Sequence, residues 1–369
     1  MPDRLPEVIF HVYPADCDML GHVNHATMLA FLERARWELL ERQDAGGVRD
    51  FARVPVWSVV RHVDIDYFAQ SLPGDDLAIR SGLLAVKNTS YIVKQDVRKV
   101  GTGAMIALLP NGIELAHDEM GSGVPLLFVH GWPHNRALWS AQLRGLSALA
   151  RCIAPDLRGF GASSVMGPYT IDQYADDLAA LLASRHVERA VVCGLSMGGY
   201  VALAMLRRHR QLLRGLILTS TRATADSSEA RAKRLSMITF VEEHGVEALA
   251  ANQLKAMVGD TTFTSRPDLL ESLRRHMAVA PRDGVVGALH AMAERADATA
   301  LLATIDIPTL VVSGAEDTIT PPVELRALAH AIPGATLQTI EGAGHLCAYE
   351  RPAAFNHLVG EFLTRLTCD

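Results

Sequence analysis

The sequence contains no long apolar run, and this absence excludes one class of protein. No stretch approaches the roughly 18 consecutive apolar residues that a membrane-spanning helix requires. Residues 1–6 open no apolar segment of about 7 to 15 residues, which is the mark of a secretory signal peptide. We therefore expect a cytoplasmic protein with no membrane partner.

Blocks of like charge are also absent. The formal net charge of −6 comes from 35 basic and 41 acidic residues that are spread along the chain. Nucleic acids and anionic membranes attract clustered basic residues, so neither is expected as the main partner. The charge pattern favours small molecules as ligands.

Cysteine pairing is a third absence. The five cysteines are odd in number and include no Cys-x-x-Cys motif, a pattern typical of reduced thiols rather than of disulfides or a metal site. We expect no metal and no cofactor. The cysteines are Cys17, Cys152, Cys193, Cys347 and Cys368.

The chain is long enough for two domains. It has 369 residues, and a single hydrophobic core rarely grows beyond about 250 to 300 residues. We find no internal repeat, no low-complexity segment and no Ser/Gly-rich linker. Two domains joined directly are expected to hold a fixed geometry.

A Gly-x-Ser-x-Gly motif is the central feature of the sequence. Apolar residues 191–193 lead into Gly194, Ser196 and Gly198, and residues 200–208 then have a helical pattern. A serine at such a strand-to-helix turn presents its hydroxyl above the sheet, and the flanking glycines remove side chains that would clash there. The motif predicts that Ser196 is a nucleophile, although a serine in an ordinary tight turn gives the same pattern.

A nucleophilic serine needs a base and an acid that orients the base. Asp317 follows a predicted buried strand at residues 308–314, and His345 follows a predicted strand at residues 336–340 and a glycine-rich loop. The order Ser, Asp, His is that of the α/β-hydrolase fold. Glu316 is an alternative for the acid.

The oxyanion of acyl transfer is expected to bind two backbone amides. One is the amide of Met197, directly after the nucleophile. The other belongs to the loop after the apolar strand 126–129, where Trp132 follows Gly131. We predict that the amides of Met197 and Trp132 form the oxyanion hole.

Residues 110–369 resemble the α/β-hydrolases of the enol-lactonase, esterase and C–C hydrolase branch. The resemblance implies a mostly parallel, doubly wound sheet, with a helical cap at about residues 222–300. A dehalogenase is not expected, because that branch has an aspartate in place of Ser196. Arg158 is expected to form a structural ion pair with Asp156 or a nearby loop carboxylate. The matching segments are 130–133, 156–163, 194–199, Asp317 and 344–345.

The N-terminal third has a different pattern. Residues 7–13 alternate like a strand, and a polar loop leads into a predicted helix at residues 26–43. Four further strands are predicted, the last of them just before a Pro-Asn-Gly turn. This pattern indicates an α+β domain with one long helix and an antiparallel sheet. The four strands are residues 54–68, 76–86, 90–99 and 104–109.

Residues 1–109 resemble hotdog acyl-CoA thioesterases of the 4-hydroxybenzoyl-CoA thioesterase type. The resemblance implies that Asp18 is a nucleophile or general base, and that backbone amides near His25 polarise the thioester carbonyl. Alternatively, Asp16, Asp18 and Asn24 cap the helix, and the domain serves dimerisation or acyl binding. The matching residues are Asp16, Asp18, 21–25, 33–36, 66–67 and 74–75.

These patterns together indicate a hydrolase of a carboxylic ester or of an acyl thioester of CoA or a carrier protein. An open edge strand in the hotdog domain predicts a homodimer or a dimer of dimers. A lactone or C–C hydrolase with a non-catalytic hotdog domain is one alternative. A receptor or scaffold that only keeps the hydrolase shape is the other.

Overall fold

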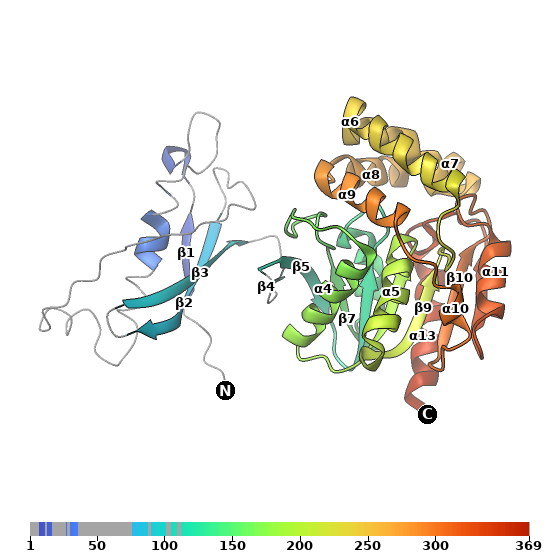
Figure 1. Cartoon of the computed structure of the whole chain (residues 1–369), viewed down its shortest axis with the longest axis horizontal. Coiled ribbons are helices and arrows are strands. Elements are labelled where there is room, and N and C mark those ends of the chain that lie inside the picture. The colour runs from blue at the N-terminus through green and yellow to red at the C-terminus, as the bar shows by residue number, and fades with distance from the viewer. Residues whose placement is uncertain are drawn as a thin grey trace, which may run out of the picture. The chain divides into compact units, whose positions relative to one another are not determined.

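The computed structural model describes residues 7–11, 13–16, 27, 30–35, 76–87, 90–100, 105–108 and 112–368. The chain divides into two units, Met1–Gly103 and Ala104–Asp369. Most of the helices drawn in Figure 1 belong to the second unit. Among the described helices, none combines the length and apolar character needed to cross a membrane.

The described part of the first unit is a three-stranded antiparallel sheet in the order β1-β2-β3. Buried Val8, Phe10 and Ile79 pack with helical Phe31 and Ala35, and the rings of Phe10 and Phe31 stack 5.1 Å apart. The strands predicted near the start of the chain and at residues 76–86 and 90–99 are confirmed. The predicted strand 54–68 lies outside the described residues. The elements are β1 (Glu7–His11), η1 (Pro14–Asp16), β2 (Asp76–Lys87) and β3 (Ser90–Val100).

The second unit is built on an eight-stranded sheet in the order β11-β10-β9-β8-β6-β7-β5-β4. Its strands are parallel except at one edge, where β4 and β5 are antiparallel to their neighbours. This is the mostly parallel sheet expected from the sequence. The strands are β4 (Met105–Leu108), β5 (Glu114–Met120), β6 (Val124–Val129), β7 (Ala150–Pro155), β8 (Ala190–Leu195), β9 (Leu213–Thr219), β10 (Thr309–Gly314) and β11 (Thr336–Ile340).

The pairing of β4 differs from one expectation. We expected residues 104–109 to form the last strand of the N-terminal domain, but β4 pairs with β5, from Leu108 opposite Glu114 to Met105 opposite His117. An alternating pattern identifies a strand without identifying its partner. The short connection to β5 allows a hairpin, so β4 joins the second sheet, and the division between the units falls before it.

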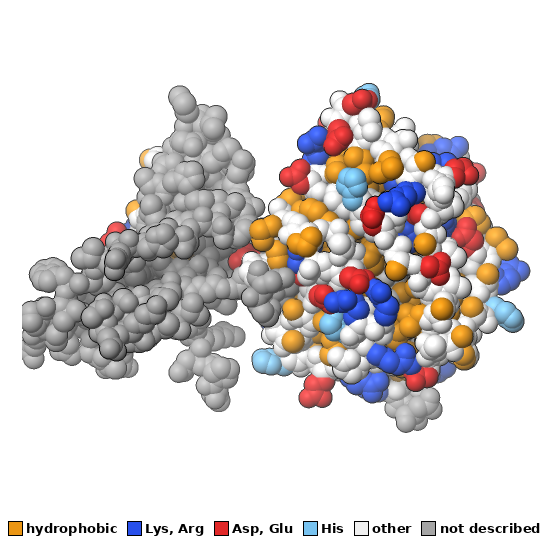
Figure 2. Space-filling view, viewed as in Figure 1, with side chains coloured by type: hydrophobic (Ala, Val, Ile, Leu, Met, Phe, Trp, Pro, Cys, Tyr) orange, Lys and Arg blue, Asp and Glu red, His pale blue; other side chains and the backbone are white. Residues whose placement is uncertain are grey.

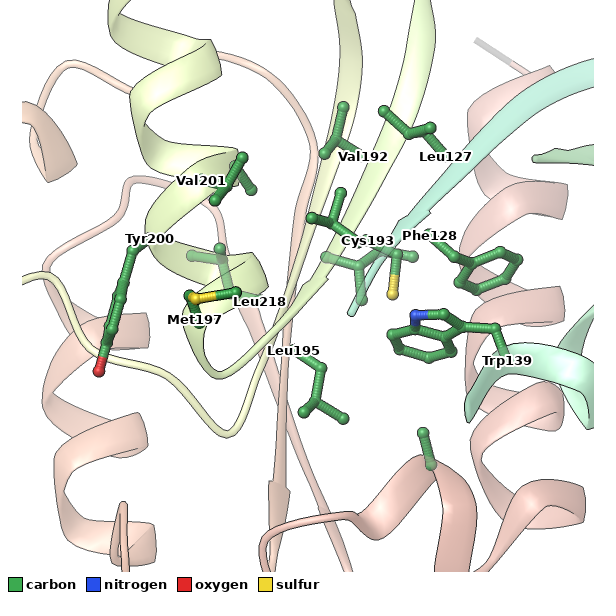
Figure 3. Close-up of a cluster of buried hydrophobic side chains, with 14 of the residues drawn as sticks. Leu127, Phe128, Trp139, Val192, Cys193, Leu195, Met197, Tyr200, Val201 and Leu218 are labelled. Carbon is green, nitrogen blue, oxygen red and sulfur yellow. The ribbon is translucent and has the colours of Figure 1, made fainter. Parts of the chain in front are cut away.

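Helices cover both faces of this sheet, and the central strands are buried because of them. Every residue of β8 and β10 is buried. In the core drawn in Figure 3, the ring of Phe128 lies 4.8 Å from that of Trp139, and Trp139 lies 6.0 Å from Phe355 of α13. The covering helices are α3 (Ser140–Leu146), α4 (Ile171–Ser184), α5 (Met197–Arg208), α11 (Pro322–His330), α12 (Cys347–Glu350) and α13 (Pro352–Cys368).

The predicted helical insertion lies between β9 and β10 and forms a cap beyond one end of the sheet (Figure 1). Ser227 caps its first helix by accepting a hydrogen bond from the Ala230 amide at 3.2 Å. Gly245, with φ of 80°, interrupts that helix. The cap helices are α6 (Ser228–Met257), α7 (Asp260–Ser265), α8 (Pro267–Ala278), α9 (Arg282–Ala293) and α10 (Thr299–Leu302).

Charged side chains of both signs are interspersed on the face of the second unit in Figure 2. Many belong to ion pairs between neighbouring elements, such as Arg208 of α5 with Asp176 of α4 at 2.7 Å. Pairs of this kind on the surface contribute little to stability, about 0 to 1 kcal/mol each.

Candidate active site

Ser196 stands at the turn between β8 and α5, in a backbone conformation that only glycine adopts easily. Its φ and ψ are 55° and −115°. The turn is close-packed, because a Cβ atom on Gly194 would clash with the Gly198 carbonyl group. A Cβ atom on Gly198 would in turn clash with the Val129 carbonyl group on the neighbouring strand β6. The two glycines of the motif therefore allow the strained turn that lifts Ser196 above the sheet.

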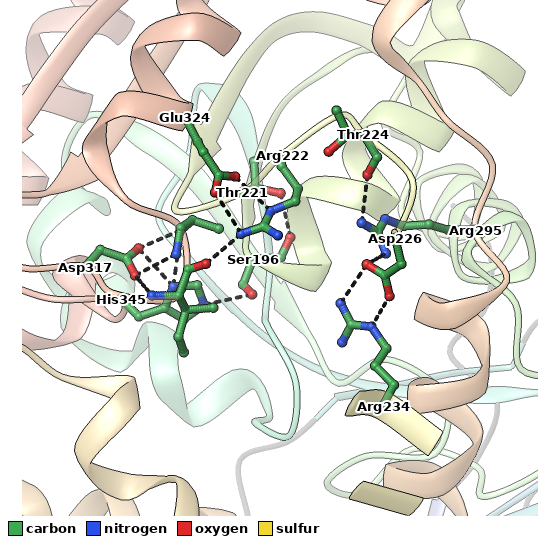
Figure 4. A network of polar contacts seen from close by, with 12 residues as sticks. Ser196, Thr221, Arg222, Thr224, Asp226, Arg234, Arg295, Asp317, Glu324 and His345 are labelled. Atoms are coloured by element: carbon green, nitrogen blue, oxygen red, sulfur yellow. Dashed lines mark hydrogen bonds and ion pairs between the residues drawn. The ribbon is translucent and has the colours of Figure 1, made fainter. Parts of the chain in front are cut away.

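The structure brings the three predicted side chains into one hydrogen-bonded chain (Figure 4). His345 Nε2 lies 2.9 Å from Ser196 Oγ, and His345 Nδ1 lies 2.9 Å from Asp317 Oδ2. The side chains of Asp317 and His345 are buried, whereas Ser196 is partly exposed. An acid on Nδ1 keeps the proton there and leaves Nε2 free to accept the serine proton, so this arrangement can activate a serine hydroxyl.

The loop after β10 holds Asp317 as an anion. Its Oδ1 accepts hydrogen bonds from the amides of Ile319 and Thr320, each at 2.9 Å, and its Oδ2 accepts one from the Thr320 hydroxyl at 2.6 Å. Burial alone raises the pKa of this carboxyl, but His345 and the donors of Thr320 outweigh it and hold the pKa below its ordinary value. The alternative acid, Glu316, faces Thr261 instead and accepts from its amide at 2.8 Å.

The two segments that carry the amides predicted for the oxyanion hole lie next to Ser196. Met197 is the first residue of α5, and a first-turn amide has no acceptor within its own helix. On the other side, a Cβ atom on Gly131 would lie 3.2 Å from Ser196 Cβ, so the loop that contains Trp132 runs directly beside the nucleophile. The Trp132 indole donates to the carbonyl of Val285 in α9 at 3.1 Å, which joins this loop to the cap.

His130 also fixes the loop that contains Trp132. Its Nε2 accepts a hydrogen bond from the Leu157 amide at 3.0 Å, and its Nδ1 donates to the Gly131 carbonyl at 2.9 Å. Burial lowers the pKa of His130 to about 4, so the ring is neutral at physiological pH. A neutral ring supplies one donor and one acceptor, which this pair of contacts requires.

Arg158 has the structural role that the sequence indicated, with a different partner. Its guanidinium binds both carboxylate oxygens of Asp177 on α4 at 2.5 Å, and both side chains are buried. Asp156 instead accepts hydrogen bonds from the Arg136 and Ala162 amides at 2.7 and 2.8 Å and forms an ion pair with Arg136. A partner on a distant helix could not be identified from the spacing of residues along the chain.

Several side chains that support this site were not predicted from the sequence. Thr221 Oγ1 donates to the Ser196 carbonyl at 2.8 Å, and Arg222 donates to the Ile319 carbonyl at 2.6 Å and pairs with Glu324 at 3.0 Å (Figure 4). Thr221 and Arg222 stand where the chain leaves β9 for the cap. They tie the nucleophile and the Asp317 loop to that point, and no motif in the sequence marks them.

Two predicted residues of the hotdog site, Asp18 and His25, lie outside the described residues. Asp16 is described, and its carboxylate accepts a hydrogen bond from the Tyr13 amide at 2.9 Å. In the part of the chain that the structure describes, no cluster of three or more His, Cys, Asp or Glu side chains is arranged to hold a metal ion.

Comparison with protein families separates the same two parts of the chain. Residues 124–352 match the model of the alpha/beta hydrolase fold, and residues 12–109 match that of the thioesterase-like superfamily. The second match reaches the end of the predicted N-terminal domain. It identifies that domain as thioesterase-like.

Individual relatives cover about two thirds of the chain. 3-Oxoadipate enol-lactonase 2 of Acinetobacter baylyi is 31% identical over 65% of this chain and 88% of its own. A pimeloyl-[acyl-carrier protein] methyl ester esterase of Neisseria meningitidis is 32% identical over 64% of this chain and 91% of its own. Among solved structures, a thermophilic esterase from Thermogutta terrifontis is 40% identical, with a TM-score of 0.69 over 71% of this chain and 98% of its own.

Proposed function

Because the chain belongs to the alpha/beta hydrolase family and is a hydrolase enzyme, we propose that it cleaves a carboxylic ester or an acyl thioester through an acyl-Ser196 intermediate. The observation that carries this proposal is the continuous contact from Asp317 through His345 to Ser196, with 2.9 Å at each step. It is the geometry that nucleophilic acyl transfer requires.

In the proposed reaction, Ser196 Oγ attacks the carbonyl carbon while His345 Nε2 takes the hydroxyl proton. The amides of Met197 and Trp132 hold the oxyanion of the tetrahedral intermediate. As the intermediate collapses, His345 returns the proton to the leaving alcohol or thiol. Water then attacks the acyl carbon and loses a proton to His345, and the second intermediate releases the acid as His345 returns that proton to Ser196 Oγ. Asp317 keeps the Nδ1 proton of His345 in place throughout.

We further propose acyl esters or thioesters of CoA or a carrier protein as the substrate class. Two observations support it: the thioesterase-like match of residues 12–109, and a relative named for a methyl ester of an acyl-carrier protein. In this proposal Asp18 is the base of a second thioesterase site, with substrate bound near His25. The protein is proposed to work in the cytoplasm as a homodimer or a dimer of dimers through its N-terminal domain.

A lactone is the second candidate substrate, favoured by the enol-lactonase relative. Lactone opening uses the same attack on a carbonyl carbon, but the leaving alkoxide stays attached to the acyl group. The thioesterase-like domain would then have no catalytic role and would serve as a dimerisation or acyl-binding module.

The test is a panel of p-nitrophenyl esters, acyl-CoAs and lactones with the wild type and the variants Ser196→Ala and Asp18→Ala. We expect Ser196→Ala to lose ester hydrolysis by about 10⁴-fold or more and to lose labelling by a fluorophosphonate probe. Acyl-CoA hydrolysis that survives in Ser196→Ala and disappears in Asp18→Ala would assign a second site to the N-terminal domain.

The matched control is Ser184→Ala, a change of an exposed serine at the end of α4 whose hydroxyl donates to the Leu181 carbonyl at 2.8 Å. It should keep wild-type turnover. If Ser196→Ala kept the activity of the wild type on every substrate, the proposed nucleophile would be wrong.

A further inference from the structure

Glu350 is a buried acidic residue that lies five positions after His345, and its exposed fraction is only 2%. A buried carboxylate is costly unless hydrogen bonds compensate for the lost water. Burial raises the pKa of Glu350 above its ordinary value, which shows that this cost is only partly offset. An acidic side chain at this buried position therefore calls for an explanation, since an apolar side chain would avoid the cost of burial.

The two carboxylate oxygens of Glu350 bind two different segments. Oε1 accepts a hydrogen bond from the Gly344 amide at 2.8 Å, directly before His345 in the chain. Oε2 accepts one from the Gly259 amide at 2.9 Å, in the cap between α6 and α7. One side chain thus holds the loop of the general base and the middle of the cap together.

Backbone contacts show how closely these segments approach. The Leu346 amide donates to the Met257 carbonyl at 3.1 Å. A Cβ atom on Gly344 would clash with the Gly259 amide, and one on Gly314 would clash with the Gly344 carbonyl. The loop that carries His345 is therefore packed backbone to backbone between the cap and the end of β10.

We propose that Glu350 is a positioning residue of the active site, which fixes the His345 loop through the Gly344 amide and fastens that loop to the cap through the Gly259 amide. It contacts neither substrate nor reacting atoms. It acts through His345, whose Nε2 must stay within hydrogen-bond reach of Ser196. The inference rests on the proposed roles of Ser196 and His345.

Glu350→Gln is the sharpest change, because it keeps the size of the side chain and removes one acceptor. Whichever way the amide is turned, its NH₂ group faces one of the two glycine amides, so two donors oppose each other. A displacement of a catalytic group by about 1 Å costs about 10²-fold in rate. We expect turnover to fall by about 10- to 100-fold, with KM changed less than about threefold.

Glu316→Gln is the matched control. Glu316 also holds the cap segment, since it accepts from the Thr261 amide at 2.8 Å, and both of its carboxylate oxygens bind Thr261. If Glu350 acted only by fastening the cap, both variants would behave alike. We expect Glu316→Gln to keep turnover within about threefold of the wild type, which is the range of one exposed hydrogen bond.

Turnover must be expressed per functional site, with Ser196 titrated by a fluorophosphonate. Loss of folded protein lowers the number of titrated sites and leaves turnover per site unchanged. Wild-type turnover per site in Glu350→Gln, or an equal loss in both variants, would overturn the assignment.

Hydrogen exchange of the peptide that contains Gly344 and His345 separates this inference from the proposed function. If the wild type hydrolysed no ester at all, the proposed function would fail. Faster exchange of that peptide in Glu350→Gln than in Glu316→Gln would still support the positioning role, and equal exchange would contradict it.

Discussion

The strands of the second sheet and the helices of the cap are stabilised in different ways. Every side chain of β8 and β10 is buried, whereas α8 buries only Leu269, Leu273 and Met277 along one stripe. The strands are therefore fixed by apolar packing on both faces, and α8 is fixed by apolar packing on one face. Catalytic side chains at the ends of these strands are held in place by the rigid sheet. The cap sequence can change without moving the strands that carry them.

The largest expected effect tests the rigid region. Asp317→Asn should lower kcat by about 10⁴-fold, because an amide stabilises the wrong tautomer of His345. Steady-state kinetics on a p-nitrophenyl ester measures this change. Glu316→Gln should remain close to the wild type, and a reversed order of the two variants would make Glu316 the acid.

The next effect compares stability in the two regions. Asp177→Ala leaves Arg158 buried without its carboxylate partner, and we expect a loss of about 3 to 5 kcal/mol in the free energy of unfolding. Arg231→Ala removes an exposed cap ion pair with Glu294 and should cost about 0 to 1 kcal/mol. Urea denaturation gives both values. Equal losses would show that the two regions do not differ as described.

A smaller effect concerns Asp226, which connects the first and last parts of the cap. Asp226 forms an ion pair with Arg234 of α6 and another, at 2.6 Å, with Arg295, which follows α9 (Figure 4). Arg295 also lies over the ring of Tyr200 in α5, with 4.1 Å between the guanidinium carbon and the ring centroid. We expect Asp226→Asn to cost about 2 kcal/mol, the contribution of hydrogen bonds to a charged group.

The pH dependence of Asp226 sharpens this prediction. Burial raises the pKa of Asp226, but Arg234 and Arg295 outweigh burial and hold the pKa below its ordinary value. The carboxylate therefore stabilises the fold above the ordinary pKa of aspartate, about 3.9, and this contribution is lost as the pH falls through the folded-state pKa. Thermal unfolding from pH 7 to 3 should show the difference between wild type and Asp226→Asn shrinking below about pH 4. A constant difference would contradict the assignment.

The parts of the site that the sequence predicted are those with local patterns. Ser196 has a glycine on each side at fixed spacing, and Asp317 and His345 each follow an apolar strand. Parallel strands bring their carboxyl ends to one edge, so the order of these residues along the chain implied their proximity. The structure brings them to 2.9 Å.

The parts that could not be predicted depend on long-range pairing. Alternation in residues 104–109 indicated a strand, but only the structure shows that β4 pairs with β5. Glu350 resembles any acidic residue near a helix start, and its two acceptors become visible only when Gly259 and Gly344 are placed together. Contacts between distant segments leave no periodic trace in a single sequence.

The conformation of Ser196 has a consequence for how this protein can be improved. A non-glycine residue with φ of 55° stores about 1 to 3 kcal/mol that folding elsewhere must offset. Directed evolution for heat resistance would reward glycine at this position, since glycine relieves the strain, and would thereby remove the proposed nucleophile. Selection for thermostability and selection for turnover thus oppose each other at Ser196. A thermostable variant must therefore gain its stability from substitutions in the cap and keep the strained turn at Ser196.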